Sequence, residues 1–550
     1  MASTAGSVAM EPGHSGRLRS LLVGVDAACL PVVEPLLDAG DLPNLERLVE
    51  RGVGGLLRSQ IPPWTPSAWP TAFTGTNPGK HGLFDFLAFD GYDWSVVDAT
   101  RLRERPIWET ASAAGLTSVV VNVPVTHPPR SFDGALIPGY TAPEDPACHP
   151  DGLLSDIRDA VGDYRVYLPG SKPYPVSAYR DLARMRGRAF RYLADRFDPD
   201  FGFVQFQVTD TIFHRRPGDQ AAVREIYRTV DDEIGRILAS CDPANVVVVS
   251  DHGIGEYGGY EFRVNEFLRR HGYVETRRGG DGMPSWATVR ESRLRAGEGG
   301  NGFGPGVAER AMALAARAGV TTQRVAPVVE SLGLTRLLGR VLPRSVVEAG
   351  AEQVDFPRSR AYMRSRSELG VRINLAGREP DGTVSPDEYE SVRADLIDLL
   401  GSVRTAEGEP VFEDVAPRER YIEGPMAEAA VDVVTVPADF DHLLSARLEG
   451  EPFGPPSEPW NHKRDGLLLA SGPSIDATVP ANGARLVDVA PTVLATLGVP
   501  VDERMDGRVL PIAESPGVEH YPPYEPASAE APADEAVEAR LADLGYLERP

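Results

Sequence analysis

The strongest constraint on the fold is a series of short apolar runs that alternate with stretches of helical periodicity. The run LLVGVD (21–26), for example, is followed by helical patterns at 30–39 and 43–52. Continuous apolar runs of this length are typical of strands that are buried on both faces of a sheet. Their alternation with helices favours an α/β fold with a mostly parallel central sheet sandwiched by helices.

Further segments of both kinds continue the pattern along the chain. Apolar runs that predict strands of this sheet occur at 118–124, 201–210, 245–253, 431–437 and 466–472. Helices are predicted between them near 176–196, 219–239, 386–401 and 485–497.

The pattern is interrupted at 276–354, which is Gly-rich at its start and amphipathic after that. We interpret this stretch as an inserted helical cap that chooses the substrate, with a peripheral helical decoration as the alternative. The α/β domain is then discontinuous, over 17–275 and 355–513. Residues 514–550 are rich in Pro, Glu and Ala and are expected to form a linker and a C-terminal amphipathic helix.

Composition excludes several classes of protein. The net charge of −24 argues against a nucleic-acid polymer as partner, because phosphate backbones are bound by basic surfaces. Three widely spaced cysteines, Cys29, Cys148 and Cys241, fit neither a disulfide framework nor a zinc knuckle. The sequence has no signal-peptide pattern and no apolar run long enough to cross a membrane. A soluble, cytoplasmic protein is expected.

Acidic and imidazole side chains follow three of the predicted strands. LLVGVD ends at Asp26, FQVTDTIFH supplies Asp210 and His214, and VVVVSDHG supplies Asp251 and His252. In open α/β sheets, ligands bind beyond the carboxyl ends of the strands. A single Asp in such a place is usually a turn or cap residue, but three such strand ends together predict a metal cluster.

The spacing of these residues restricts their geometry. Asp210 and His214 are four apart and can share one helical face and one ion. Asp251 and His252 are adjacent, so on a strand they would point to opposite faces. They are expected in a turn just past the strand, which the following Gly253 would allow.

Several motifs occur in the order shown by a known family: VGVD, IPPWTPSAWPTAFTGTNPGKHGLFDF (61–86), DTIFH, SDHG and WNHKRDGLLLASGP (460–473). The sequence resembles the alkaline phosphatase superfamily, in the branch of type I phosphodiesterases and nucleotide pyrophosphatases. The resemblance spans roughly residues 19 to 512. The discontinuous domain would then be an alkaline phosphatase-like catalytic domain.

The resemblance implies two divalent metal ions, each bound by acidic and histidine side chains. The ligands would be Asp26, Thr65, Asp251 and His252 for one ion, and Asp210, His214 and His462 for the other. Zinc fits this set of ligands best, and manganese is the alternative. The assignment of His462 depends on the resemblance alone, while His81 is expected to have a structural role.

Thr65 is the implied nucleophile, since it lies ahead of the TG…P..HG motif that begins at Thr74. Two alternatives remain open. Thr65 could instead cap the helix that follows, or act in both ways, because a helix N-terminus also stabilises a phosphate. Ser67 is the rival nucleophile.

The sequence departs from the family at one position. Members usually place an Asn just after the HG motif, where it binds a phosphoryl oxygen, but Phe86 stands there in this chain. Asn77 and Lys80 are two candidate substitutes. There is no Cys-x-Pro-x-Arg motif, which disfavours a sulfatase.

These residues predict a metal-dependent hydrolase of small phosphate esters that forms a phospho-threonine intermediate. A phosphodiesterase or nucleotide pyrophosphatase is the first interpretation. A phosphomonoesterase or phosphonate hydrolase on the same site is the second, and a phosphotransferase is the third. The net charge of −24 makes bound metal ions the expected source of positive charge for the substrate.

Overall fold

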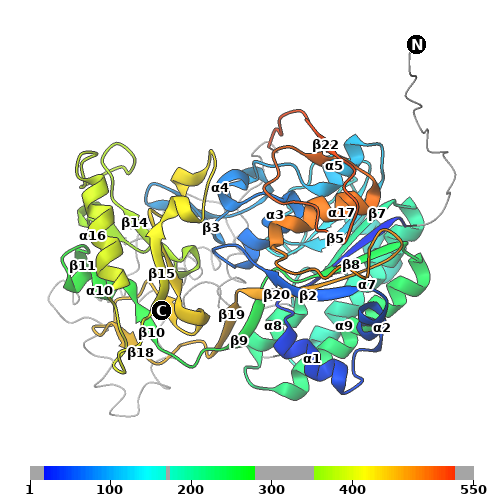
Figure 1. Cartoon of the computed structure of the whole chain (residues 1–550), viewed down its shortest axis with the longest axis horizontal. Coiled ribbons are helices and arrows are strands. Elements are labelled where there is room, and N and C mark those ends of the chain that lie inside the picture. Colours follow the sequence, from blue (N-terminus) through cyan, green and yellow to red (C-terminus); the bar gives the residue numbers. More distant parts are fainter. Residues whose placement is uncertain (1–17, 169–173, 279–351, 527–550) are drawn as a thin grey trace.

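A computed structural model describes residues 18–168, 174–278 and 352–526 (Figure 1). Its centre is a seven-stranded sheet in the order β2-β20-β8-β1-β7-β5-β6. The strands are β2 (Val53–Arg58), β20 (Asp465–Ser471), β8 (Asn245–Val249), β1 (Ser20–Val25), β7 (Phe201–Phe206), β5 (Ser118–Val123) and β6 (Gly134–Pro138). Neighbours are parallel except at β20, which runs antiparallel to both β8 and β2. The predicted mostly parallel α/β fold is confirmed.

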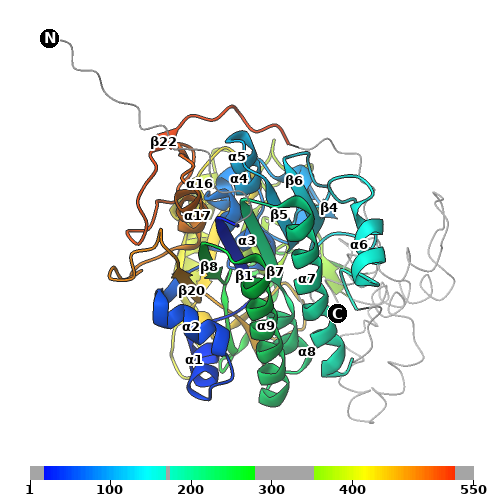
Figure 2. The same cartoon turned by 90° about the vertical axis from the view of Figure 1, so that its right-hand side faces the viewer.

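Helices cover both faces of this sheet because its strands bury side chains in both directions. Leu21 and Val23 of β1 belong to a core under α1 (Leu30–Asp38), α2 (Pro43–Arg51), α7 (Val176–Phe197), α8 (Val208–Arg215) and α9 (Gln220–Cys241). Leu22 lies in the opposite core, with α3 (Thr65–Thr74), α5 (Ile107–Ala113) and α17 (Val489–Leu497). Figure 2 shows α7 and α9 running side by side along the sheet.

A second body of the structure, here called the accessory region, comprises residues 261–278 and 352–454. Its largest sheet has the order β13-β14-β16-β15 and is antiparallel. The strands are β13 (Ala361–Tyr362), β14 (Gly370–Ile373), β16 (Val433–Pro437) and β15 (Phe412–Pro417), and the helix α16 (Tyr389–Gly401) packs on them (Figure 1). A separate apolar core holds the region together.

The accessory region contradicts one prediction. The run at 431–437 was expected in the central sheet, but β16 lies in the accessory sheet. Every residue of β16 is buried. The continuous apolar run therefore predicted correctly that this strand is buried on both faces. Such a run does not indicate which sheet the strand joins.

Two predicted segments lie largely outside the described residues. Of the expected cap at 276–354, the structure describes only its two ends, β11 (Thr276–Arg278) and β12 (Glu352–Val354), which pair antiparallel. Of 514–550, it describes residues up to 526, including β22 (Val518–Glu519), which pairs with β21 (Val501–Asp502). The domain boundaries stay a prediction. Among the described helices, none has both the length and the apolar content needed to span a membrane.

Gly24 shows how tightly the central strand is packed. A β-carbon at this position would lie 2.5 Å from Trp69 Cη2 and 3.0 Å from Gln205 Cγ. We expect Gly24→Ala to lower the free energy of unfolding by about 1–3 kcal/mol, as overpacking of cores does. Gly55→Ala on β2 is the matched control, since a β-carbon there meets no atom within 4 Å. Equal losses in urea denaturation of the two variants would contradict this account.

Candidate metal centre

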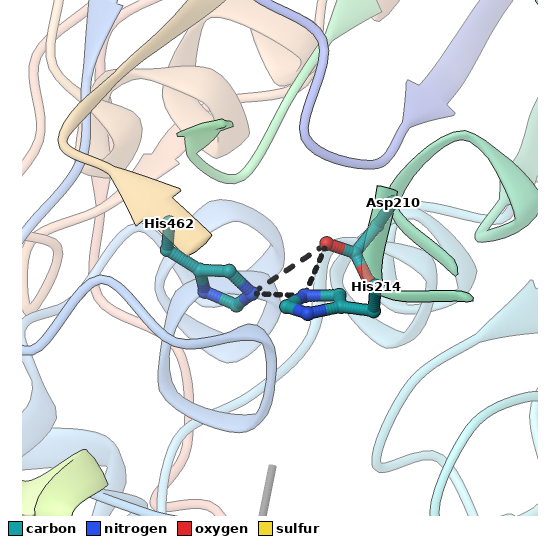
Figure 3. Close-up of side chains that lie close together, drawn as sticks. All are labelled: Asp210, His214 and His462. Atoms are coloured by element: carbon teal, nitrogen blue, oxygen red, sulfur yellow. Dashed lines mark hydrogen bonds and ion pairs between the residues drawn. The ribbon is translucent and has the colours of Figure 1, made fainter. Parts of the chain in front are cut away.

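One acid–histidine group lies where α8 meets a two-stranded ribbon. Asp210 and His214 lie four residues apart on α8, and His462 lies on β19 (Trp460–Lys463). Asp210 Oδ1 is 3.3 Å from His214 Nε2 and 3.5 Å from His462 Nε2, and the two Nε2 atoms are 3.4 Å apart (Figure 3). The three atoms thus form a nearly equilateral triangle, and the three residues that the resemblance assigned to one ion lie together.

A second group surrounds His252 Nε2. This atom lies 3.2 Å from Asp251 Oδ2, 3.6 Å from Asp26 Oδ1 and 3.4 Å from Thr65 Oγ1. The carboxylates and imidazole are completely buried, as is Thr65. All four residues that the resemblance assigned to one ion therefore lie together.

The spacing in both groups suits a small divalent ion. Zinc binds nitrogen and oxygen ligands at about 2.0–2.2 Å, so a tetrahedral ion separates its ligand atoms by about 3.3–3.6 Å. The distances in the first group are 3.3, 3.4 and 3.5 Å, which is this edge length. The residues present therefore fit a bound ion in geometry as well as in chemistry.

Hydrogen bonds orient the ligand atoms. His252 Nδ1 lies 2.9 Å from Gly253 O, and His462 Nδ1 lies 3.3 Å from Pro63 O. Donation from Nδ1 to these carbonyls leaves the lone pair on Nε2, the atom that faces the carboxylates. Each neutral imidazole is therefore in the tautomer that a metal ligand needs.

Asp26 is oriented in the same way through its second oxygen. Its Oδ2 accepts hydrogen bonds from Gln205 Nε2 at 2.6 Å and from Trp69 Nε1 at 3.2 Å. Asn122 in turn donates to Gln205 Oε1 at 2.8 Å from a bulge in β5, where its φ is +63°. These contacts leave Oδ1 of Asp26 to face His252.

The two groups are neighbours. The rings of His252 and His462 are stacked, with centroids 3.6 Å apart and planes 18° apart. The ribbon explains this contact, because β9 (Gly253–Glu256) follows His252 directly and pairs with β19, with His462 opposite Ile254. Pairing of β9 with β19 thus places His462, which is distant in sequence from the other candidate ligands, at the edge of the main sheet.

The local backbone agrees with most of the sequence interpretation. Asp251 and His252 lie in a turn between β8 and β9, as expected. Gly253, however, has no positive φ; a β-carbon there would collide with Asp465 O, so close approach to the neighbouring strand requires the glycine. Thr65 is the first residue of α3, and Trp64 occupies the N-cap without a side-chain cap. The helix-cap alternative for Thr65 is therefore wrong.

Burial makes the site unfavourable for its own charges. Burial raises the pKa of Asp251 to about 7, and together with the charges of Asp251 and Asp210 it raises the pKa of Asp26 well above its usual value. Asp26 Oδ1 and Asp251 Oδ2 have no hydrogen-bond partner within the described residues. To be ionised near neutral pH, these buried carboxylates need a compensating positive charge, which divalent ions would supply.

The histidines respond to burial in the opposite sense. Burial lowers the pKa of His252 to about 4 and that of His462 to about 3, so both are neutral near pH 7. Burial alone would raise the pKa of Asp210, but His214 and His462 hold it well below its usual value. Ionised Asp210 and neutral His252 and His462 are therefore in the protonation states that metal ligands require. Burial would also lower the pKa of His214, but the charge of Asp210 and its hydrogen bond raise it.

Other candidate residues lie elsewhere. Ser67 is buried inside α3, and its Oγ has no hydrogen-bond partner within the described part of the chain. Asn77 and Lys80 both contact Asp506, with Nδ2 and Nζ at 2.9 and 2.6 Å from its carboxylate. Phe86 is fully buried and packs edge-on against Tyr140, with ring centroids 5.9 Å apart. The structure therefore gives neither substitute a place among the metal-binding groups.

The supporting residues Trp69, Gln205 and Asn122 were not predicted from the sequence. Gln205 lies on β7 next to β1, and its side chain faces the same region as Asp26 only because the two strands are paired. A Gln in the otherwise apolar run FGFVQF was the one available signal. Trp69 and Asn122 gave no such signal, since both look like ordinary core or turn residues.

The arrangement has known counterparts. The sequence profile described as type I phosphodiesterase / nucleotide pyrophosphatase matches residues 21–328. No curated protein sequence matches the chain. Among solved structures, phosphonoacetate hydrolase from Sinorhizobium meliloti 1021 is 16% identical with a TM-score of 0.52, over 88% of this chain and 96% of that chain. At this identity the likeness shows a shared fold.

Two further solved structures are similar at a lower TM-score. Murine ectonucleotide pyrophosphatase / phosphodiesterase 5 is 13% identical with a TM-score of 0.46, over 87% of this chain and 95% of that chain. Alkaline phosphatase PafA is 14% identical with a TM-score of 0.49, over 91% of this chain and all of that chain, 100%.

The fold and the candidate site together define the general class of this protein, and the profile match defines its family. A mostly parallel sheet sandwiched by helices carries two acid–histidine groups at its edge, so the protein is an α/β protein with two candidate metal-binding groups. The profile match covers more than half of the chain, so the protein belongs to the type I phosphodiesterase / nucleotide pyrophosphatase family. This is a family of hydrolytic phosphoesterases.

His81 allows a test of its structural role. Its Nε2 lies 2.9 Å from Thr71 Oγ1, its Nδ1 accepts from Leu83 N at 3.2 Å, and burial lowers its pKa to about 3. Because the pKa of His81 is lower in the folded protein than in the unfolded chain, the unfolded chain binds a proton at a higher pH. Protonation then favours the unfolded chain, so the folded protein loses stability as pH falls below about 6.5.

Between about pH 7.5 and 5.5, we expect His81 to cost the folded state about 1.4 kcal/mol, from the difference between its folded and unfolded pKa. His81→Gln removes the titration, so the stability difference between wild type and variant should shrink by that amount over the same interval. Chemical denaturation at both pH values measures it. If the difference in free energy of unfolding between wild type and variant is the same at both pH values, His81 does not gain a proton on unfolding in this interval.

Proposed function

We propose that this protein hydrolyses phosphate esters at two divalent metal ions, with Thr65 as the nucleophile. The observation that carries the proposal is the position of Thr65 Oγ1, 3.4 Å from His252 Nε2. The carboxylates of Asp26 and Asp251 approach the same nitrogen atom. A hydroxyl held among metal ligands at a helix N-terminus is a recognised way to activate a weak nucleophile.

The proposed ligands divide as the two groups do. Asp26, Thr65, Asp251 and His252 would hold one ion, and Asp210, His214 and His462 the other. When bound, the ions would supply the positive charge that favours deprotonation of the attacking hydroxyl and offsets charge on the leaving oxygen. Zinc suits the nitrogen and carboxylate donors best, and manganese is the alternative.

The chain's own residues perform two displacements at phosphorus. In the first, a bond forms between Thr65 Oγ1 and phosphorus while the ester P–O bond breaks. The hydroxyl proton is released, and the leaving oxygen takes up a proton. In the second, water attacks the phospho-threonine, and its P–O bond to Thr65 breaks to restore the hydroxyl. Because α3 begins at Thr65, its N-terminus would present the positive end of the helix dipole to a phosphoryl group bound there.

A diester or pyrophosphate bond in a small molecule is the proposed substrate, in keeping with the family. Phe86 stands where that family usually places a phosphoryl-binding Asn, so oxygen contacts must differ from the family pattern. Comparing a chromogenic diester, monoester and phosphonate on one preparation would rank the three substrate classes. The cytoplasmic location also stays a prediction.

Removal of the metal ions tests whether hydrolysis depends on them. Exhaustive chelation should abolish hydrolysis, and zinc or manganese should restore it, because both groups need a compensating charge. Metal analysis should find about two ions per chain, the number expected of a two-metal hydrolase. Full activity in a preparation whose metal content has been verified as negligible would disprove the two-metal proposal.

A further prediction concerns the nucleophile. Thr65→Ala should lower kcat by at least about 1,000-fold, because the covalent step is lost. Metal content should persist, since Asp26, Asp251 and His252 still hold the ion.

Ser67→Ala is the matched control. It removes a buried hydroxyl two residues away on the same helix and should leave kcat within about threefold of wild type, because surface-inaccessible hydroxyls without partners contribute little. An inactive Ser67→Ala together with an active Thr65→Ala would reverse the assignment.

A further inference from the structure

An ion pair joins the accessory region to the ribbon that carries His462. Arg366 begins the 3-10 turn Arg366–Glu368, next to β14. Its Nη2 donates to Glu458 Oε1 at 2.8 Å. Only 7% of the Arg366 side chain and 22% of the Glu458 side chain are exposed. The pair is therefore largely shielded from solvent, at the junction of the two bodies of the structure.

The contact continues to the backbone of a proposed metal ligand. The second oxygen of Glu458 accepts from Asn461 Nδ2 at 2.8 Å. Asn461 Oδ1 in turn accepts from the backbone N–H of His462, also at 2.8 Å. Both carboxylate oxygens and both amide atoms are used, so the chain of contacts from Arg366 to His462 has no break.

His462 is fixed on its other sides as well. Tyr257 donates from its hydroxyl to His462 O at 2.6 Å, and the ring of Trp64 lies 4.5 Å from the imidazole centroid. The ring can thus present Nε2 to Asp210 and His214 in one orientation. Arg366 and Glu458 also lie within electrostatic range of His214, the other imidazole of this group.

Stability alone is a poor reason for such a pair. Burying two charges costs about as much free energy as their attraction returns, and apolar side chains of similar size often serve as well. A hydrogen-bonded charged pair does restrict direction, which matters where a ligand must be held to within a fraction of an ångström. Residues that orient metal ligands from behind are a recurrent feature of metal sites.

We propose that Arg366, Glu458 and Asn461 are positioning residues for the metal ion held by Asp210, His214 and His462. The inference rests on the proposed function, since it requires that this group bind an ion. It assigns the accessory region a role in the metal centre: Arg366 fixes Glu458, Glu458 fixes Asn461, and Asn461 fixes the backbone from which His462 projects.

Metal binding itself provides the test. Chelated wild-type protein and variants are titrated with Zn²⁺, and separately with Mn²⁺, by calorimetry. His214→Ala and Asp251→Asn assign the two binding phases to the two groups. Glu458→Ala should weaken binding at the His462 group by about 10- to 100-fold, the usual effect of losing an orienting residue. Binding at the His252 group should change by less than about twofold.

Two more conservative substitutions should weaken metal binding at the His462 group by less than Glu458→Ala does. Glu458→Gln keeps one accepting oxygen and should fall between Glu458→Ala and wild type. Arg366→Lys keeps a positive donor and should lie close to wild type. The control is Glu379→Gln, which breaks another buried pair of the accessory region, Arg372–Glu379 at 2.8 Å, with 6% and 2% of the side chains exposed. It should leave both affinities unchanged, even if it lowers stability.

The possible outcomes separate the two proposals. Wild-type protein that binds no ion at either group would refute the proposed function, and the inference with it. Wild-type protein with two ions and Glu458→Ala with the same two affinities would refute only the positioning role. If Glu458→Ala does not fold, equal affinities in Glu458→Gln and wild type refute it instead. Equal weakening of both groups, matched by Glu379→Gln, would show a merely structural contact.

Discussion

Three carboxylates, those of Asp26, Asp210 and Asp251, are completely buried within one small region at the edge of the main sheet. Isolated buried charges are among the most unfavourable features a protein can contain. The residues around these carboxylates reduce this unfavourable free energy through several contacts. Hydrogen-bond donors engage one oxygen of Asp26, imidazoles lie beside an oxygen of each of the three carboxylates, and the spacing of the ligand atoms suits divalent ions.

The two bodies of the structure meet near the candidate site. The main sheet supplies Asp26, the α8 residues and the Asp251–His252 turn, all at the carboxyl ends of β1, β7 and β8. It cannot supply His462, which enters on the β9–β19 ribbon. Contacts between the ribbon and the accessory region run through Glu458 and Arg366. The accessory region thus lies where it can influence the metal centre without contributing a ligand.

Phe86 separates this chain from the usual pattern of its family near the phosphoryl group. The side chain packs into an aromatic cluster with Tyr140 and Tyr167. An apolar ring stands at this position, while both acid–histidine groups are present in full. Differences in activity within this family can therefore arise beside an unchanged pair of metal-binding groups, since the two depend on different side chains.

The sequence by itself determined the class of fold and most of the site. Apolar runs fixed β1, β7 and β8, and the residues after them, Asp26, Asp210 and Asp251, had to meet at one sheet edge. The resemblance added Thr65 and His462, which local spacing could not reveal. Only the tertiary structure decided that β16 belongs to a second sheet, that Gln205 and Trp69 contact Asp26, and that Glu458 contacts Asn461. The physical reason is that strand formation and burial are encoded locally, whereas strand partners and side-chain neighbours depend on pairing between distant segments, such as β9 with β19.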